Sequence, residues 1–288
     1  MPSNSKKYVW VTDTHLDHLC FDGVPKDDRW DNFVQELNNR SPEAVIITGD
    51  ISNALYIKDH LKLLEQQLTT SKVFFILGNH DFYGGSIEKV RKSMVEEVSS
   101  EKMVYLSSLG YVPLTETTAL VGHDGWYDGL YANWFAPNVV LMNDYLVIKE
   151  MRDVWFGSYS DASLNKQRTH TLMGKLAKEC EFHIHKNLSE AAKTHKTVLF
   201  ATHVPPFAEN SRYRGAVSSP AWLPNFSSKY AGDALLEVAK AHPDNQFIVL
   251  CGHSHGNALF KPLRNLECHT GFAEYGFPEA SIKVLEIE

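Results

Sequence analysis

Short apolar runs alternate with amphipathic stretches along this chain. Five of the runs are strand-like, because β-branched and aromatic residues follow one another over a few positions. They predict strands at residues 8–12, 44–48, 73–77, 198–201 and 247–251. Elsewhere apolar residues recur at three- and four-residue spacing, which is typical of a helix with one buried face. These stretches predict helices at residues 27–40, 56–70, 86–99, about 163–193 and 233–241.

Shorter apolar segments complete the predicted elements. Strands are expected at residues 102–106, 111–113 and 118–121, ahead of the long helical stretch. Three more, at residues 258–261, 266–269 and 282–287, are expected to finish a second sheet. The alternation of strands and helices indicates an α/β fold. Since the sequence contains no repeat, low-complexity segment or linker, one domain over residues 1–288 is the simplest organisation.

A short polar block follows each of the five principal strands. The blocks are Asp13-Thr14-His15, Gly49-Asp50, Gly78-Asn79-His80-Asp81, Thr202-His203 and Gly252-His253-Ser254-His255. In an α/β sheet the carboxyl ends of the strands form the crevice where ligands bind. The five blocks are therefore expected to bring Asp, Asn and His side chains into one pocket. This residue set predicts a site for two metal ions.

The spacing within the blocks suits metal binding. Residues i and i+2 of a strand point to the same side, so Asp13 and His15 can reach one ion together. His253 and His255 can do the same if the chain stays extended there. Asp, His and Asn are ligands expected of Zn, Mn or Fe. Asp50, the only ligand type in its block, is the candidate bridge between two ions.

The charge of such a site favours a phosphorylated substrate. Two divalent ions contribute +4, two carboxylates −2 and a bridging hydroxide −1, which leaves a net charge of about +1 to attract a phosphoryl group. Metal coordination lowers the pKa of water enough to supply hydroxide at neutral pH. His80 is expected to contact the substrate and to stabilise or protonate the leaving oxygen. Asp81 is expected to orient the His80 imidazole.

At these residues the chain resembles the calcineurin-like metallophosphoesterase superfamily. The motifs D-x-H, G-D, G-N-H-D, H-x-P and G-H-x-H occur in that order between residues 13 and 255. The resemblance implies two face-to-face mixed β-sheets flanked by helices, a four-layer α-β-β-α sandwich. It also implies a catalytic role for His80. By the same likeness one metal takes Asp13, His15, Asp50 and His255, and the second takes Asp50, Asn79, His203 and His253.

Composition adds limits on partners and location. The chain has 288 residues, of which 43% are hydrophobic and 22% charged, and its formal charge is −7. The acidic balance and the lack of a dense Lys/Arg run argue against a long nucleic-acid duplex as a partner. Four scattered cysteines are expected to be reduced thiols in a cytoplasmic protein. No signal-like segment or bilayer-spanning apolar stretch is evident, so no membrane partner is expected.

The substrate side is less defined by the sequence. A stretch around residues 123–165 is a candidate insertion, in which Trp126 and Tyr127 could stack on a base or sugar; the alternative is a packed loop with buried aromatic residues. Arg212 and Arg214 could clamp a phosphate, although exposed loop arginines are common. His123 is not expected to bind a metal, because both ligand sets are already complete.

The sequence as a whole predicts a metal-dependent phosphoesterase that acts on a small phosphorylated substrate. Ile51-Ser52-Asn53 follows Asp50 where protein Ser/Thr phosphatases of this superfamily carry V-D-R-G, and His80-Asp81 stands where they carry His-Glu. A dedicated protein phosphatase is therefore disfavoured. Phosphate monoesters and diesters both remain open, as do the choice among Mn, Zn and Fe and the oligomeric state. The alternative is a non-catalytic phosphate-ligand-binding or scaffold protein that retains the fold.

Overall fold

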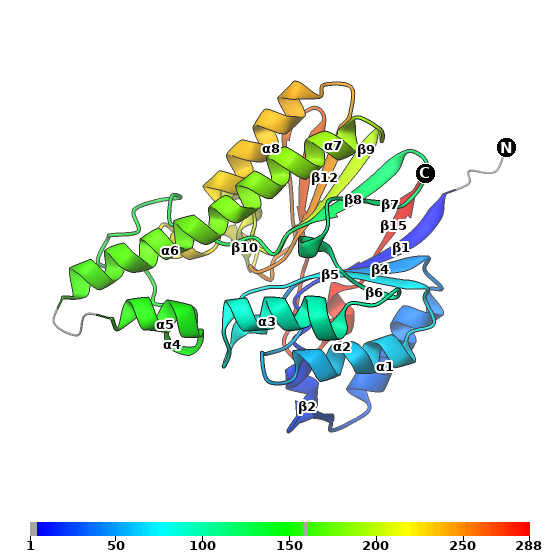
Figure 1. Cartoon of the computed structure of the whole chain (residues 1–288), viewed down its shortest axis with the longest axis horizontal. Helices are drawn as coiled ribbons and strands as arrows, with labels where there is room; N and C mark the ends of the chain where they lie inside the picture. Colours follow the sequence, from blue (N-terminus) through cyan, green and yellow to red (C-terminus); the bar gives the residue numbers. More distant parts are fainter. Residues whose placement is uncertain (1–4, 158–160) are drawn as a thin grey trace.

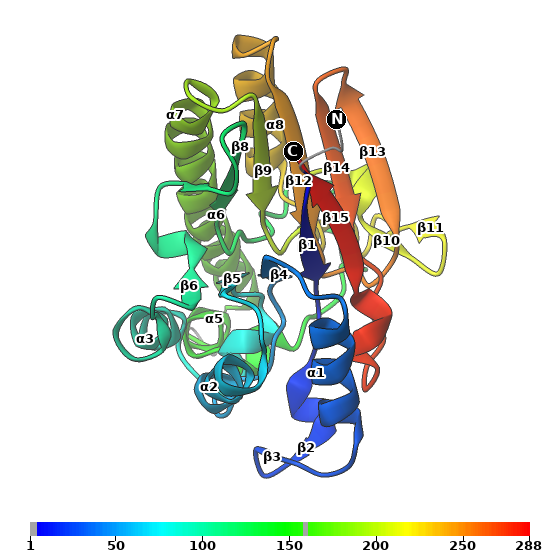
Figure 2. The ribbon, with the colours of Figure 1, turned by 90° about the vertical axis from the view of Figure 1, so that its right-hand side faces the viewer.

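Two β-sheets stacked face to face form the centre of the molecule, seen here in a computed structural model that describes residues 5–157 and 161–288 (Figures 1 and 2). The first sheet of this described part has the order β15-β1-β4-β5-β6, and the second has the order β13-β14-β12-β9-β8-β7. The strands of the first sheet are β15 (Lys283–Ile287), β1 (Lys6–Val11), β4 (Ala44–Thr48), β5 (Lys72–Ile76) and β6 (Met103–Tyr105). Those of the second are β13 (Ala258–Leu263), β14 (Leu266–Thr270), β12 (Gln246–Cys251), β9 (Thr197–Ala201), β8 (Thr118–Gly122) and β7 (Val112–Pro113).

Helices cover the outer faces of both sheets. Helices α1 (Arg29–Asn39), α2 (Ile57–Gln67) and α3 (Ile87–Ser93) lie against the first sheet, and α6 (Ala162–His183), α7 (Ser189–Ala192) and α8 (Lys229–Ala241) lie against the second (Figure 2). Two short helices, α4 (Asp144–Val147) and α5 (Lys149–Trp155), pack beside the first half of α6 (Figure 1). Two small ribbons complete the described strands: β2 (Cys20–Phe21) with β3 (Val24–Pro25), and β10 (Arg212–Tyr213) with β11 (Ala216–Val217).

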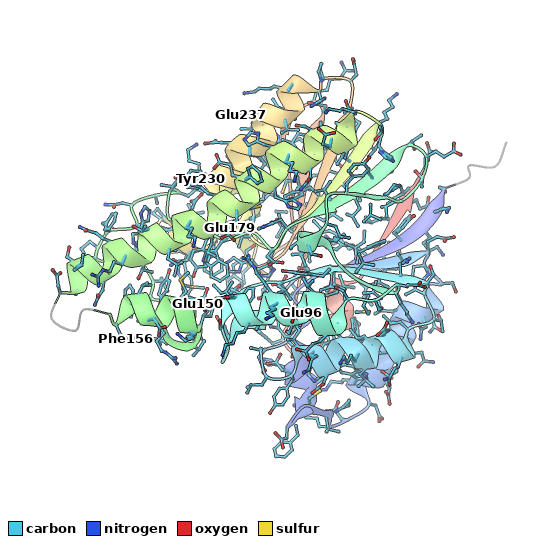
Figure 3. The ribbon with its side chains drawn as sticks, viewed as in Figure 1. Glu96, Glu150, Phe156, Glu179, Tyr230 and Glu237 are labelled. Atoms are coloured by element: carbon cyan, nitrogen blue, oxygen red, sulfur yellow. The ribbon has the colours of Figure 1, made fainter. Side chains whose placement is uncertain are left out.

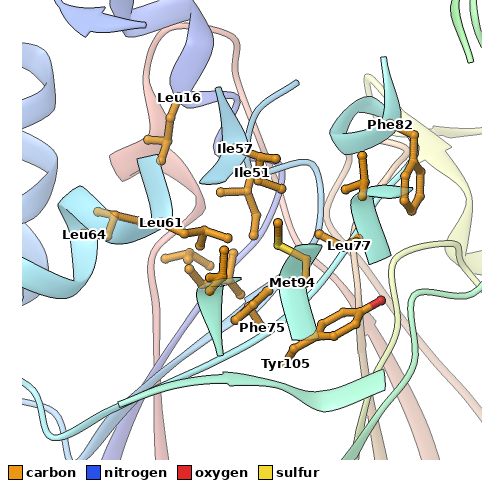
Figure 4. Packing of buried hydrophobic residues seen from close by; sticks show 14 of the residues in the cluster. Leu16, Ile51, Ile57, Leu61, Leu64, Phe75, Leu77, Phe82, Met94 and Tyr105 are labelled. Carbon is orange, nitrogen blue, oxygen red and sulfur yellow. The ribbon is translucent and has the colours of Figure 1, made fainter. Parts of the chain in front are cut away.

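Alternation along the strands builds the layers. Tyr8 and Trp10 of β1 face the second sheet, where they join Leu120, Leu199 and Leu250 in one buried cluster. Their neighbours Val9 and Val11 point the other way, into the core beneath α1 and α2. Figure 4 shows this outer core, in which Leu61 and Leu64 of α2 pack near Phe75 of β5. The predicted four-layer sandwich is therefore confirmed.

The last strand departs from prediction. Residues 282–287 were expected in the second sheet, but β15 pairs antiparallel with β1 of the first sheet, with Lys6 opposite Ile287. The prediction was wrong because a strand's own apolar pattern does not identify its partner. In this position β15 covers the open edge of β1, which otherwise exposes unpaired backbone groups.

Two predicted helices are interrupted near their ends. The stretch 163–193 consists of α6, a π-helical turn at Ile184–Leu188 and α7. The stretch 86–99 consists of α3 followed by a π-helical turn at Met94–Val98. Glu150 of α5 lies beside the start of α3 (Figure 3) and its carboxylate accepts the Ile87 N–H at 2.9 Å. This contact joins the segment containing α4 and α5 to the first sheet's helical layer.

Candidate metal centre

The five polar blocks meet where the two sheets open at the carboxyl ends of their strands. Loops after β1, β4 and β5 come from the first sheet, and loops after β9 and β12 come from the second. The backbone joins them: the Asp13 N–H donates to the Gly49 carbonyl at 3.0 Å, and the Gly252 N–H donates to the His203 carbonyl at 2.9 Å. The sheet stacking thus brings residues more than 200 positions apart into one site.

Five of the polar residues hold a left-handed backbone conformation, with φ between 41° and 68°: Asp13, His15, Asp50, His253 and His255. Such conformations are uncommon outside glycine and cluster at functional sites. They also correct the expectation of extended chain at these blocks. The turn in the backbone sends His253 and His255 to different ligand groups, which an extended segment would not do.

Two glycines allow the blocks to approach closely. A Cβ on Gly78 would lie 2.2 Å from Oδ1 of Asp50, and one on Gly252 would lie 2.1 Å from Oδ2 of Asp13. Both distances are far below van der Waals contact. Any side chain at either position would displace the carboxylates, so glycine is required by the packing of the site.

The first ligand group is formed by Asp13, His15, Asp50 and His255, whose ligand atoms all lie within 4.8 Å of one another. The Nε2 atoms of His15 and His255 are 3.3 Å apart. Nε2 of His255 lies 3.4 Å from Oδ1 of Asp13, and Nε2 of His15 lies 3.9 Å from Oδ2 of Asp50. Two carboxylates and two imidazoles therefore converge on one point, the donor set expected for a transition-metal ion.

The second group is formed by Asp50, His203 and His253, with Asn79 beside them. Nε2 of His203 lies 3.3 Å from Oδ1 of Asp50 and 3.2 Å from Oδ1 of Asn79. Nδ1 of His203 lies 2.9 Å from the Thr48 carbonyl, and Nε2 of His253 lies 2.9 Å from the Asn225 carbonyl. Only a ring N–H can bond to a carbonyl, so the other nitrogen of each ring is left unprotonated in the neutral form. Metal-binding histidines are usually oriented in this way.

The pKa values in the site reflect burial and ion pairing. Burial lowers the pKa of His203, but the Asp50 carboxylate outweighs it and raises the pKa to about 10. Burial raises the pKa of Asp13, but the nearby His255 outweighs it and holds that pKa below its usual range. Burial, with His203 adding to it, lowers the pKa of His253 to about 4. Burial also raises the pKa of Asp50, but the nearby His203 outweighs it and holds that pKa well below its usual range. The carboxylates of Asp13 and Asp50 are thus ionised at neutral pH, the state that cation binding requires.

Asn79 is oriented by Asp144, a residue that the sequence analysis did not single out. Its Nδ2 donates to Oδ1 of Asp144 at 3.1 Å, which turns its Oδ1 toward His203. The hydroxyls of Tyr83 and Tyr127 donate to the same carboxylate at 2.6 and 2.7 Å. Asp144 is fully buried and lies 65 positions from Asn79. No motif marks it, and only its isolation as an acid among aromatic residues signals a specific role.

His80 lies at the border between the ligand groups and solvent. The backbone N–H of His80 donates to Oδ1 of Asp50 at 2.8 Å, and Nε2 of the His80 ring lies 4.0 Å from Oδ2 of Asp50. The ring stacks on Tyr83 with centroids 4.2 Å apart, and a quarter of the side chain is exposed. Tyr83 thus joins the His80 ring to the carboxylate that orients Asn79.

Asp81 has a different role from the one predicted. Its Oδ1 accepts the N–H groups of Ile51 and Ser52, both at 2.8 Å, and its Oδ2 accepts the Gly78 N–H at 2.7 Å. The expectation that it orients the His80 ring was wrong, because three backbone donors occupy the carboxylate. Asp81 instead ties the loop carrying Asp50 to the loop carrying Asn79.

A cavity of about 620 Å³ opens beside the two ligand groups. Its described walls include Asn79 and His80, residues 140–143, residues 213–222 in part, and Tyr275. The predicted substrate residues lie elsewhere. Trp126 and Tyr127 are 2% and 0% exposed and fill the core, as the packed-loop alternative had it.

The two arginines predicted to clamp a phosphate do not point into the cavity either. Arg212 donates to the carbonyls of Glu209 and Gly215 at 3.1 and 3.2 Å, which stabilises the ribbon of β10 and β11. The Arg214 guanidinium lies over the Tyr213 ring at 5.2 Å. Neither residue lines the cavity in the described part of the chain, although the residues between and after them do.

Comparison with known proteins places these residues in a family. The family model described as calcineurin-like phosphoesterase matches residues 6–257. The chain is 29% identical over 129 residues to an uncharacterized metallophosphoesterase of Campylobacter jejuni, a match that covers 44% of this chain and 32% of that protein. Among solved structures, a dimetal phosphatase from Danio rerio aligns with a TM-score of 0.58 and 12% identity, over 98% of this chain and 92% of the other. The last likeness shows the shared fold.

No helix in residues 5–157 and 161–288 combines the length and apolar character needed to cross a bilayer.

Proposed function

The chain belongs to the calcineurin-like phosphoesterase family, and from this membership we propose that it hydrolyses phosphate mono- or diesters with the help of two metal ions. The family supports the class predicted from the sequence, a hydrolase acting on phosphoric ester bonds. The observation that carries the proposal is the shared carboxylate: Asp50 belongs to both ligand groups. A carboxylate with two oxygens can bind two cations at once, which is the arrangement that a two-metal site requires.

The ligand assignment follows from the contacts. We assign Asp13, His15, Asp50 and His255 to one ion, and Asp50, Asn79, His203 and His253 to the other. Mn, Zn and Fe all suit these oxygen and imidazole donors, and a Cys-free set does not choose among them. When bound, two such cations lower the pKa of water and neutralise phosphoryl charge. The carboxylates of Asp13 and Asp50 leave a pair of divalent ions with net positive charge.

His80 is the proposed catalytic histidine. Its ring reaches the cavity while its backbone N–H is fixed to Asp50, so the imidazole is held beside the place where a phosphoryl group binds. Protonated, the ring donates to the leaving oxygen or stabilises the charge that develops there. Stacking on Tyr83 limits its rotation.

Residues 123–165, of which 158–160 lie outside the described residues, are the proposed substrate-side insertion of a single domain. Residues 140–143 form part of the cavity wall, and Asp144 orients a proposed metal ligand. The cavity accommodates a small phosphorylated molecule, since pockets of 300–1,000 Å³ are typical for small ligands.

The proposal is tested by metal reconstitution. Metal-stripped protein is assayed with p-nitrophenyl phosphate and bis-p-nitrophenyl phosphate after addition of Mn, Zn or Fe. Turnover that returns when metal is added supports the proposed phosphoesterase activity. The preferred substrate then distinguishes a monoesterase from a diesterase. Two bound metals without turnover of either substrate would favour the non-catalytic phosphate-ligand-binding protein, and a chain that binds no metal would contradict the proposal.

A further inference from the structure

The cavity next to the ligand groups has an aromatic wall. Among the described residues, five Tyr, Trp and Phe side chains line it: Tyr83, Tyr213, Trp222, Phe226 and Tyr275. Three of them remain substantially exposed, with 57%, 44% and 46% of their surface accessible for Tyr213, Trp222 and Tyr275. Large aromatic side chains are usually buried, and exposed rings gathered around a cavity mark a surface that binds an apolar partner.

The rings divide into two sets by what they contact. Tyr83 stacks on His80, Phe226 stacks on His253 at 4.6 Å, and Tyr275 lies 4.4 Å from the His15 ring. These three therefore pack against site histidines. Trp222 touches Phe226 edge-on at 5.5 Å and, like Tyr213, keeps about half of its surface free for a ligand.

In the described part of the chain, the same wall lacks lysine and arginine side chains. The nearby Arg212 is engaged by two backbone carbonyls, and Arg214 lies over the Tyr213 ring. A second phosphate or an acidic peptide would therefore find no built partner, because anions are bound by basic side chains or backbone N–H groups. Asn143, Ser218 and Ser219 supply only neutral hydrogen-bonding groups.

The two sides of this wall are joined. The Val140 N–H donates to the Ala221 carbonyl at 3.0 Å, and Nδ2 of Asn225 donates to the Val140 carbonyl at 2.9 Å. Asn225 also accepts from His253 through its own carbonyl. One backbone hydrogen bond and two side-chain-to-backbone hydrogen bonds therefore hold the wall in place relative to the ligand groups.

We propose that this protein selects phosphoesters whose organic group carries a flat, uncharged ring system, which stacks against Trp222 and Tyr213 while the phosphoryl group lies at the Asp50 and His80 end. The inference rests on the proposed phosphoesterase function. Stacking of a planar ring on an aromatic side chain strengthens binding by roughly five- to a hundredfold.

The test uses substrate pairs that share the ribose 5-phosphate group and differ in whether a flat ring is attached to it. The monoester pair is adenosine 5′-monophosphate and ribose 5-phosphate. The diester pair is the methyl esters of the same two compounds, so that neither member carries a second aromatic ring. In the pair that the enzyme hydrolyses, kcat/KM for the ester with the ring is expected to exceed kcat/KM for the ester without it by at least about tenfold. Calorimetric affinities of the monoester pair for the His80→Ala protein provide a ratio that does not depend on turnover.

Two variants locate the effect. Trp222→Ala and Tyr213→Ala are each expected to reduce the ratio several-fold, whereas Phe182→Ala, an exposed aromatic residue on α6 outside the cavity, is expected to leave it unchanged. A ratio near one in the wild-type protein, with p-nitrophenyl phosphate or its diester still hydrolysed, would overturn the inference and leave the proposed function standing. A ratio kept at its wild-type value in both aromatic variants would also overturn it. If no ester is hydrolysed, the proposed function fails and the affinity ratio alone decides the inference.

Discussion

At the scale of single residues, Asp50 is shared by both ligand groups. Its two oxygens face different partners, with Oδ1 near His203 and Oδ2 near His15. Asp13 belongs to the first group alone. We expect Asp50→Asn to weaken both metals and to abolish turnover, while the matched Asp13→Asn loses only one metal. Metal content per chain after dialysis, measured by mass spectrometry, checks this. Retention of one tightly bound metal in Asp50→Asn would show that Asp50 is not the bridge.

His80 offers a contrasting prediction, since it lies outside both ligand groups. His80→Ala is expected to keep two metals per chain and to lose on the order of 10²–10⁴ in kcat, the usual contribution of acid–base assistance. A reaction whose leaving group needs no proton, such as release of p-nitrophenolate, should suffer least. Full activity on a substrate with a poor leaving group would remove His80 from the mechanism.

The proposed ligands could be selected from the sequence because each lies within four positions of the end of an apolar run, so local sequence indicated both the strand and the polar residues after it. The residues around them were not. Asp144 reaches Asn79 only through the packing of a distant segment, and Asp81 was assigned to the wrong partner because sequence proximity to His80 says nothing about backbone donors. The predicted aromatic residues Trp126 and Tyr127 fill the core, while Trp222 reaches the cavity from a loop that carried no signal.

At the scale of elements, α4 acts on the metal centre through its first residue. Asp144 accepts from Asn79 and Tyr83, and through them is linked to a proposed ligand and to the His80 ring. We expect Asp144→Asn to reduce affinity for the second metal by about 10–100-fold while the first remains bound, the usual effect of losing a partner that orients a ligand. Titration with Co²⁺, followed by absorption, separates the two sites.

The control for Asp144 is another buried aspartate. Asp128 accepts the Tyr230 N–H at 2.8 Å and belongs to neither ligand group. Asp128→Asn should therefore leave both metal affinities unchanged even if it lowers stability. Equal loss of metal in the two variants would mean that Asp144 acts through the fold in general.

Two histidines, one after β8 and one at the end of α6, are expected to make folding stability depend on pH. Burial lowers the pKa of His123 to about 3, and burial lowers that of His183, whose ring centroid is 5.1 Å away, to about 4. An unfolded histidine has a pKa of about 6.5, so below that pH the unfolded chain binds more protons than the folded one. Folding stability is therefore expected to fall as pH decreases from about 6.5 toward 3–4, by about 1 kcal/mol per pH unit for His123.

A substitution isolates this contribution. His123→Asn keeps an acceptor for the Gly125 N–H, which donates to Nδ1 of His123 at 3.0 Å, but does not titrate. Urea unfolding of metal-free protein at pH 7 and pH 5 should show a smaller loss of stability in the variant than in the wild type. The site histidines are common to both proteins, so their titration cancels in the comparison. Equal losses would show that His123 is not held neutral.

At the scale of elements the sequence predicted the strands of the two large sheets but not every pairing partner, and it did not predict the small ribbons β2–β3 and β10–β11. Apolar runs reveal strands because burial on both faces leaves little room for polar residues. Pairing depends on tertiary contacts, and β15 joined the first sheet rather than the second for that reason. Similarly, helical periodicity predicted residues 163–193 as one helix, although it did not reveal the π-helical turn at Ile184–Leu188.

At the scale of the whole molecule, the metal centre lies across the junction of the two sheets. Asp13, Asp50 and Asn79 follow strands of the first sheet, whereas His203 and His253 follow strands of the second. Each ligand group contains residues from both sheets. Bound ions would therefore connect the two halves of the sandwich, and their binding energy would contribute to folding stability as well as to chemistry.

This arrangement predicts that metal stabilises the fold. A ligand that binds only the folded state adds about 2.7 kcal/mol at a hundred times its Kd, and about 1 kcal/mol raises Tm by roughly 2–4 °C in a domain of 150–250 residues. Calorimetric unfolding with and without a chelator should therefore show a Tm several degrees higher for metal-loaded protein, increasing with metal concentration. Asp50→Asn should abolish the metal-dependent increase, whereas His80→Ala should retain it. An identical Tm for loaded and stripped wild-type protein, with two metals bound at saturation, would mean that the ions do not connect the sheets energetically.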